Sequence, residues 1–172
     1  MNTKQRLIQR LKWYYPLERL HAFVTFPFFI ALVWYLYPLK ETIFITYGLV
    51  VCTYILFQGQ KYWKIKLSRL RNQSIDQEKT LRFFEQSKKI NVFLLGLIPI
   101  FFVIQLWLMN WEITMNRLFL FSVFVNIFAV LEHINYYHIQ LMIDNKYDFL
   151  YVLRNKKLKR ASLANDLDRK QF

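Results

Sequence analysis

Four long apolar runs constrain what this chain of 172 residues can fold into. A helix needs about 20 apolar residues to cross the hydrocarbon core of a bilayer. The second and fourth runs are shorter than this, but each continues helically through aromatic residues that suit the headgroup level. The sequence therefore predicts four transmembrane helices, from about Leu20 to Leu39, Thr42 to Phe57, Ile90 to Met109 and Leu118 to Leu131.

A bundle of four buried helices in water is the alternative explanation of these runs. Apolar residues make up 55% of the chain, and helices that are apolar on every side would leave so short a protein without a polar face to dissolve it. Run length thus favours the membrane. The single cysteine, Cys52, lies within an apolar run, which excludes an internal disulfide and a Cys-based metal site. We expect an all-α integral membrane protein.

Basic residues are segregated along the chain, which carries 24 Lys and Arg against 11 Asp and Glu. Five of them fall in residues 1–19, nine in residues 60–89 and eight in residues 144–172, while Lys40 and Arg117 occupy the short connections on the other side. Cytoplasmic loops are enriched in Lys and Arg, so both the N-terminus and the C-terminus should be cytoplasmic. The expected location is the cell membrane, as a multi-pass protein of a bacterial plasma membrane. No nucleic-acid-binding motif accompanies the charge, so nucleic acid is not an expected partner.

The two halves of the apolar region resemble each other. Pro27 and its apolar neighbours match Pro99 and its neighbours at an offset of 72, and residues 58–67 match residues 132–141 at an offset of 74. Two tandem helical hairpins of the same orientation explain this pattern, related by a pseudo-twofold axis along the membrane normal. The expected domains are a four-helix membrane domain over 1–143, with repeats 1–71 and 74–143, and a basic cytoplasmic tail over 144–172.

A short amphipathic stretch precedes each hairpin. In the first, Leu7, Leu11 and Tyr14 recur at helical spacing among basic residues, and in the second, Ser74 and Gln77 form the sequence of a capping box. Amphipathic helices with basic polar faces lie at the membrane interface. We therefore expect short interfacial helices ahead of the first and third spans.

The fourth span ends among ionisable residues, which are costly near lipid and therefore informative. A metal site is not expected there, because His133 and His138 are five residues apart whereas helical ligand pairs favour a spacing of three or four. A proton relay or acid/base centre stays open. The alternative is a structural cluster in which Glu132 pairs with a lysine of the first half across the pseudo-axis. The candidate polar cluster comprises Glu132, His133, Asn135, His138, His21, Lys61 and Lys64.

The basic segments close to the membrane are expected to contact anionic lipid headgroups, which attract each nearby Lys or Arg by about 1 kcal/mol. Asn126, near the middle of the fourth span, is expected to make an interhelical contact. The candidate lipid-facing residues are Arg6, Arg10, Lys12, Lys156, Lys157, Lys159 and Arg160.

Motifs of common enzyme classes are missing from the chain: it has no Gly-x-Ser-x-Gly, no Walker loop and no dinucleotide fingerprint. The leading hypothesis is a small non-catalytic membrane protein, without cofactor, whose basic cytoplasmic face docks a protein partner or anionic lipid. The alternative is a membrane-embedded enzyme that uses the Glu and His residues of the polar cluster. A third possibility is a homo-oligomeric pore or transporter.

Topology is testable by cysteine labelling of intact cells. A cysteine placed at Glu41 or Asn116 should react with an impermeant reagent, because the basic asymmetry puts both positions outside. A cysteine at Asn72 or Asn165 should react only after the cells are opened. Reaction of the second pair in intact cells would overturn the orientation.

Overall fold

The computed structural model of the chain describes residues 3–112, 117–143 and 146–172, except for the side chains of Thr3, Lys4, Arg6 and Tyr147. Every regular element in these residues is a helix, so the all-α prediction is confirmed. The elements are α1 (Thr3–Leu20), a π-helical turn η1 (His21–Thr25), α2 (Phe26–Leu36), α3 (Leu39–Leu70), α4 (Gln77–Gly96), α5 (Ile98–Leu108), α6 (Arg117–Tyr137), α7 (Lys146–Asn155) and α8 (Ser162–Asp168).

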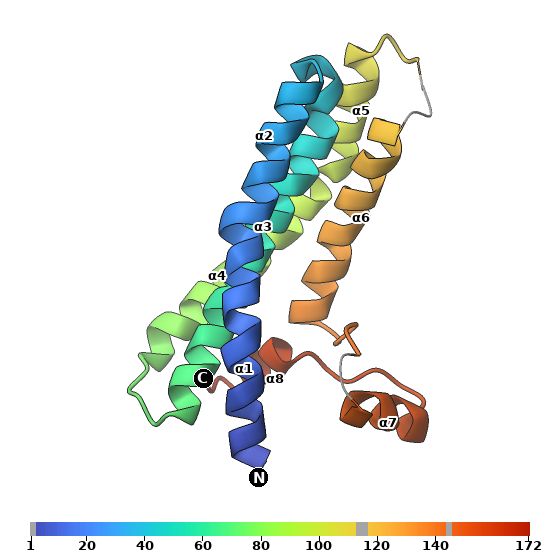
Figure 1. Cartoon of the computed structure of the whole chain (residues 1–172). Coiled ribbons are helices and arrows are strands. Elements are labelled where there is room, and N and C mark those ends of the chain that lie inside the picture. The colour runs from blue at the N-terminus through green and yellow to red at the C-terminus, as the bar shows by residue number, and fades with distance from the viewer. Residues whose placement is uncertain (1–2, 113–116, 144–145) are drawn as a thin grey trace.

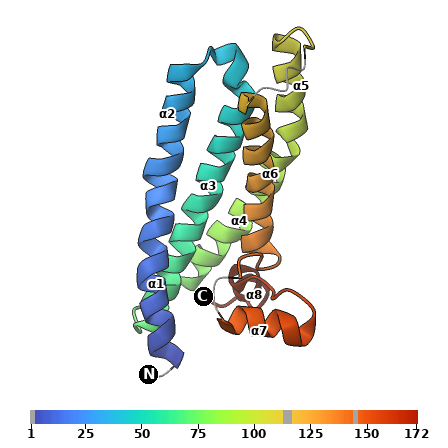
Figure 2. The same ribbon diagram turned by 45° about the vertical axis from the view of Figure 1, so that its right-hand side comes forward.

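Four continuous helical stretches of the described residues are long and apolar enough to cross a membrane, which confirms the predicted number of candidate spans. Both termini, the connection between α3 and α4, and helices α7 and α8 lie at one end of the bundle (Figures 1 and 2). The turn between α2 and α3 lies at the other end. The stretches are Leu7–Leu36, Leu39–Leu70, Gln77–Leu108 and Arg117–Tyr137, with 30, 32, 32 and 21 residues.

Two prolines leave local irregularities in the helices without ending them. Pro27 has no amide hydrogen to donate to the preceding turn, and the wider π-helical turn ahead of it absorbs the mismatch. The amide of Phe26 accordingly donates to the carbonyl of His21, five residues earlier. Pro99 lies where α4 passes into α5, and there the amide of Leu97 donates to the carbonyls of the preceding turn.

The amphipathic stretches differ from the expected separate interfacial helices, because each is continuous with the span that follows it. No glycine or proline interrupts residues 77–95, so the polar turns of α4 extend directly into its apolar turns. The predicted capping box is not formed either. Asp76 is the N-cap, and its Oδ1 accepts a hydrogen bond of 3.0 Å from the amide of Lys79, since an aspartate in extended conformation satisfies that role alone.

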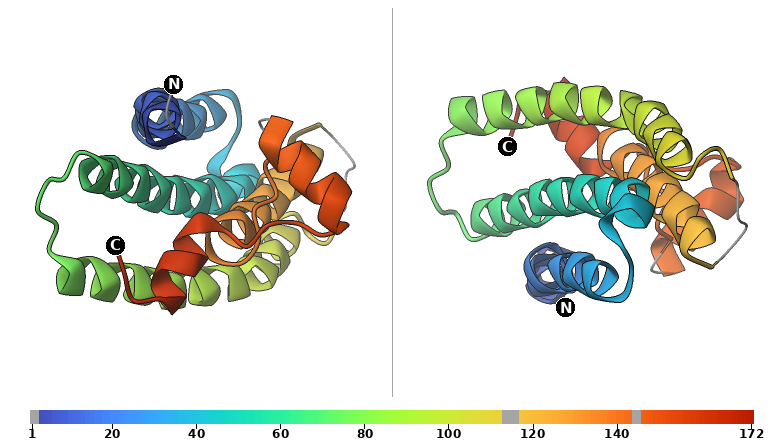
Figure 3. Two further views of the ribbon diagram at one scale, coloured as in Figure 1. Left: turned by 90° about the horizontal axis from the view of Figure 1, so that it is seen from below. Right: turned by 90° about the horizontal axis from the view of Figure 1, so that it is seen from above.

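Helix α3 is the centre of the bundle, with α1 and α2 on one side and α4 and α5 on the other (Figure 3). In its most apolar stretch 61% of the residues are buried inside the protein, against 28% or less in the other three spans. The remaining spans therefore expose most of their apolar side chains outward, as expected of helices surrounded by lipid.

The contact between α3 and α6 is made possible by small residues. A Cβ atom at Gly48 would approach Asn126 Nδ2 to 2.8 Å, and one at Gly59 would overlap the hydroxyl of Tyr136. Asn126 Nδ2 donates to the carbonyl of Phe44 over 2.9 Å, which confirms its predicted interhelical contact. Such close approach is how helices associate where lipid removes the hydrophobic driving force.

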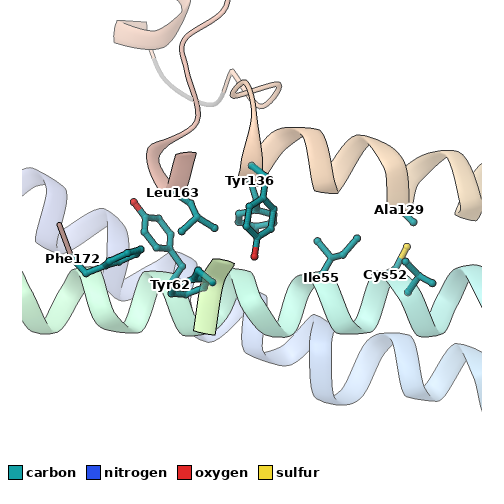
Figure 4. Packing of buried hydrophobic residues seen from close by; sticks show 10 residues of the cluster. Cys52, Ile55, Tyr62, Ala129, Tyr136, Leu163 and Phe172 are labelled. Carbon is teal, nitrogen blue, oxygen red and sulfur yellow. The ribbon is translucent and has the colours of Figure 1, made fainter. Parts of the chain in front are cut away.

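The C-terminal part of the charged tail packs back against the bundle through α8, which contacts α4 and α6. Leu163 and Phe172 are buried beside Tyr62 and Tyr136, at the opposite end of the core from Cys52 (Figure 4). The ring of Phe172 stacks on that of Phe84 with centroids 5.4 Å apart. The tail therefore closes the end of the core where α3, α4 and α6 diverge.

Substitution of Gly59 tests the contact between α3 and α6. Gly59→Ala should destabilise the protein by about 1–3 kcal/mol, because its methyl group has to displace the buried Tyr136 side chain. Thermal unfolding in detergent measures this loss. Gly96→Ala is the matched control: a Cβ atom there would have no other atom within 4 Å, so the same change should not lower the melting temperature. Equal melting temperatures for the two variants would reject the close packing.

Candidate functional site

The candidate site is the basic end of the bundle, formed by residues 3–19, 60–89 and 146–172. The alternation of four spans brings these three segments together, although they are far apart in the sequence (Figure 1). Many of their basic side chains are exposed, including Lys12, Arg19, Lys64, Arg69, Arg71, Lys89, Arg154, Lys156, Lys157, Arg169 and Lys170.

The predicted lipid-facing residues divide into exposed and paired groups. Lys12, Lys156 and Lys157 are exposed, whereas Arg160 forms a salt bridge with Asp168. Two more point inward: Lys159 Nζ lies 2.5 Å from Asp148 Oδ1, and Arg10 lies 3.8 Å from Asp148 Oδ2. The side chain of Arg6 lies outside the described residues.

The predicted polar cluster is dispersed over several surroundings. His133 is buried and stacks on Tyr137 at 5.1 Å, with the exposed His138 ring 5.4 Å away. His21 bonds Thr25 on its own helix at 3.3 Å. Asn135 Oδ1 accepts a hydrogen bond of 2.9 Å from the amide of Leu141 and so caps the end of α6.

Glu132 does not form the predicted ion pair with Lys61 or Lys64, and none of the three is in a salt bridge among the described residues. Lys61 Nζ instead lies 3.2 Å from the centroid of the Phe83 ring. Both lysines face the groove beside α1, whereas Glu132 interacts with Asn135 on its own helix. Within the described chain, no group of three or more His, Cys, Asp or Glu side chains is arranged to hold a metal ion.

A buried carboxylate that was not predicted from the sequence lies between α1 and α6. Tyr136 donates its hydroxyl hydrogen to Glu18 Oε1 over 2.5 Å. Glu18 Oε2 and the indole nitrogen of Trp63 are both buried and have no hydrogen-bond partner among the described residues. Glu18 is the only acidic residue in the first 40 positions, which is the signal that could have identified it.

A second feature that was not predicted is an amide network in the core. Gln58 and Asn91 exchange two hydrogen bonds of 2.9 and 2.8 Å, and Tyr137 donates to Gln58 Oε1 over 2.6 Å. All three side chains are almost completely buried. Because these groups satisfy one another, the network ties α3 to α4 and α6 without a charge in the interior.

A cavity of about 240 Å³ lies beside Glu18, between α1, α3, α6 and the tail. Lys66 lines it and is held by Asp166, 3.5 Å away, and by contacts with Ser162 and Tyr62. The cations on its wall are engaged by Asp148 and Asp166, and Glu18 is bonded to Tyr136, so the cavity offers little unpaired positive charge to a ligand.

A larger groove of about 560 Å³ lies on the other side of α1, against α3. One wall carries Tyr15 and Arg19 of α1 and Phe23 of η1, and the α3 wall carries Phe57, Lys61 and Lys64. No acidic residue lines it. The groove therefore combines unopposed positive charge with aromatic surface.

No family model, no curated protein and no solved structure matches the chain. The chemistry of the basic end is consequently the basis on which its function is inferred.

The amide network predicts a specific pattern of stabilities. Asn91→Leu should lower the free energy of unfolding by about 1–3 kcal/mol, because Gln58 Nε2 is left buried without an acceptor. The triple variant Asn91→Leu/Gln58→Met/Tyr137→Phe removes the polar groups together and should recover part of that loss. Thermal unfolding in detergent measures both. Gln86→Leu, at an exposed position of α4, is the control. If the triple variant were much less stable than Asn91→Leu, mutual satisfaction would not be the role of the network.

Proposed function

We propose that this chain is a small non-catalytic, multi-pass membrane protein whose basic end binds the headgroups of anionic lipids. In this proposal the four apolar helices cross the plasma membrane as two hairpins. Both termini and the connection between α3 and α4 are then cytoplasmic.

The observation that carries the proposal is the gathering of exposed basic side chains around one end of four apolar helices. Several of the few acids at that end are already engaged: Asp148 by Arg10 and Lys159, Asp166 by Lys66. Arg82 and Arg160 are also paired with acids, whereas exposed side chains such as Lys12, Lys156 and Lys157 keep their positive charge available at the depth of the headgroups. Anionic lipids of the cytoplasmic leaflet attract such charge by about 1 kcal/mol per residue near the surface.

Helix α7 adds support, because it lies across the bundle axis at this end (Figures 1 and 2). Phe149 and Leu153, one turn apart, are 54% and 59% exposed. Met142 and Ile143, just before α7, are also exposed. A short helix with exposed apolar residues on one face and basic residues nearby suits the boundary between headgroups and acyl chains.

The enzyme and pore hypotheses have less support. His133 and His138 lie side by side with ring centroids 5.4 Å apart, but Glu132 interacts with Asn135 and forms no salt bridge with either histidine among the described residues. The interior polar groups of α3 are largely bonded within the core, which leaves few of them to line a water-filled path.

Lipid selectivity tests the proposal. The purified protein is placed in vesicles of mixed phosphatidylglycerol and phosphatidylcholine. It should restrict the motion of spin-labelled phosphatidylglycerol more than that of spin-labelled phosphatidylcholine. High salt should reduce this preference, since headgroup attraction is screened. Neutralising exposed basic residues outside the groove should reduce it as well; a suitable variant replaces Lys12, Arg71, Arg154, Lys156, Lys157 and Lys170 by Gln. Equal restriction of the motion of the two labelled lipids would reject the proposal. If the membrane protein showed no lipid preference and one other protein copurified with it stoichiometrically, docking of a protein partner would be favoured instead.

A further inference from the structure

We infer that the groove between α1 and α3 is the binding site of a single anionic phospholipid, with its phosphate held by Arg19, Lys61 and Lys64 and an acyl chain lying over Phe23 and Phe57. This inference rests on the proposed function and adds the place on the basic end at which one lipid binds specifically.

The charge of the groove is unusual even for this end of the protein. No carboxylate lines it, and among the described residues its three cations have no salt-bridge partner. Arg10 and Lys159, at the neighbouring cavity, are by contrast engaged by Asp148. The ammonium group of Lys79 adds to the positive potential at Lys61. A phosphate is the counterpart that this arrangement lacks.

The helical register orders the groove along the bundle axis. Residues 15 and 19 of α1 and residue 23 of η1 follow one helical face at a spacing of four, and residues 57, 61, 64 and 68 follow one face of α3. Because the helices are antiparallel, Arg19 lies near the level of Lys61, while Phe23 meets Phe57 with ring centroids 5.9 Å apart. The cations thus lie toward the basic end, and the aromatic pair lies toward the middle of the spans.

This order matches a phospholipid and not a soluble phosphate. Phe23 is 54% exposed and lies within the first candidate span, where a soluble anion has nothing to gain from it. The hydroxyl groups of Ser68 and Ser74, at the other end of the groove, are placed to bond the polar part of a headgroup. Basic pockets between helices at the membrane surface are the sites at which proteins hold anionic headgroups.

Native mass spectrometry of the detergent-purified protein tests the site. The wild-type protein should retain one phosphatidylglycerol in preference to phosphatidylcholine. Arg19→Gln/Lys61→Gln/Lys64→Gln should weaken phosphatidylglycerol binding at least tenfold, since each basic residue contributes about fivefold in affinity. The control, Lys40→Gln/Arg117→Gln, removes exposed positive charge from the other end of the bundle and should change this affinity less than about twofold.

Two further variants distinguish loss of the binding site from misfolding of the protein. Lys64→Gln changes one exposed side chain and should by itself weaken binding severalfold. Lys61→Arg/Lys64→Arg keeps both charges and should bind phosphatidylglycerol almost as well as the wild type. Loss of binding in the arginine variant together with full binding in Lys64→Gln would overturn the assignment.

The remaining outcomes separate this inference from the proposed function. If wild type and the groove triple variant bound phosphatidylglycerol equally and both preferred it to phosphatidylcholine, the groove would be rejected while the basic end as a whole kept its role. Absence of any preference in the wild type would reject both. Displacement of the lipid by millimolar glycerol 3-phosphate would show that the site takes a soluble phosphate, which would overturn the commitment to a membrane lipid.

Discussion

The close contact of α3 with α6 is the interaction on which the rest of the structure depends. Every other span packs on α3, so the position of α3 determines where the walls of the groove and the cavity lie. Gly48 and Gly59 allow the two backbones to approach, and Asn126 and Tyr136 of α6 occupy the space that larger residues would fill. In the proposed membrane setting, lipid supplies no hydrophobic force between helices, so shape and hydrogen bonds would hold this contact.

Amide side chains provide much of that hydrogen bonding. Gln105 of α5 accepts from the amide of Phe44 and donates to the carbonyl of Lys40, so it joins the first turns of α3 to a helix 61 residues later. Gln58 and Asn91 make the equivalent link nearer the basic end. Neutral amides satisfy each other without the desolvation penalty of an ion pair. Charged groups are correspondingly concentrated at the basic end, where the groove can present them to a ligand.

The spans could be predicted from the sequence, because run length is a property of consecutive residues. The partners of Gln58 and Gln105 could not, since they lie 33 and 61 residues away and depend on how the helices rotate. The same limit explains the error at Glu132. The repeat in the sequence placed it opposite Lys61 and Lys64, but the rotation of α3 puts both lysines on the wall of the groove, with the ammonium group of Lys61 over the ring of Phe83. Charge segregation in the sequence grouped the basic segments that gather at one end of the molecule, and only packing separates the paired cations of that end from those of the groove.

The salt bridge between Lys66 and Asp166 has a consequence for how the chain is made. Lys66 precedes its partner by 100 residues, so during synthesis it emerges as an uncompensated cation. In the proposed membrane topology, the insertion machinery encounters Lys66 with its full charge, at the stage when basic residues orient the helices. Asp166 neutralises it only after all four spans have been produced. Under that proposal Lys66 would serve first as a topological signal and later as an anchor for the tail. A neutral substitution at position 66 would then affect biogenesis and the mature protein at different times.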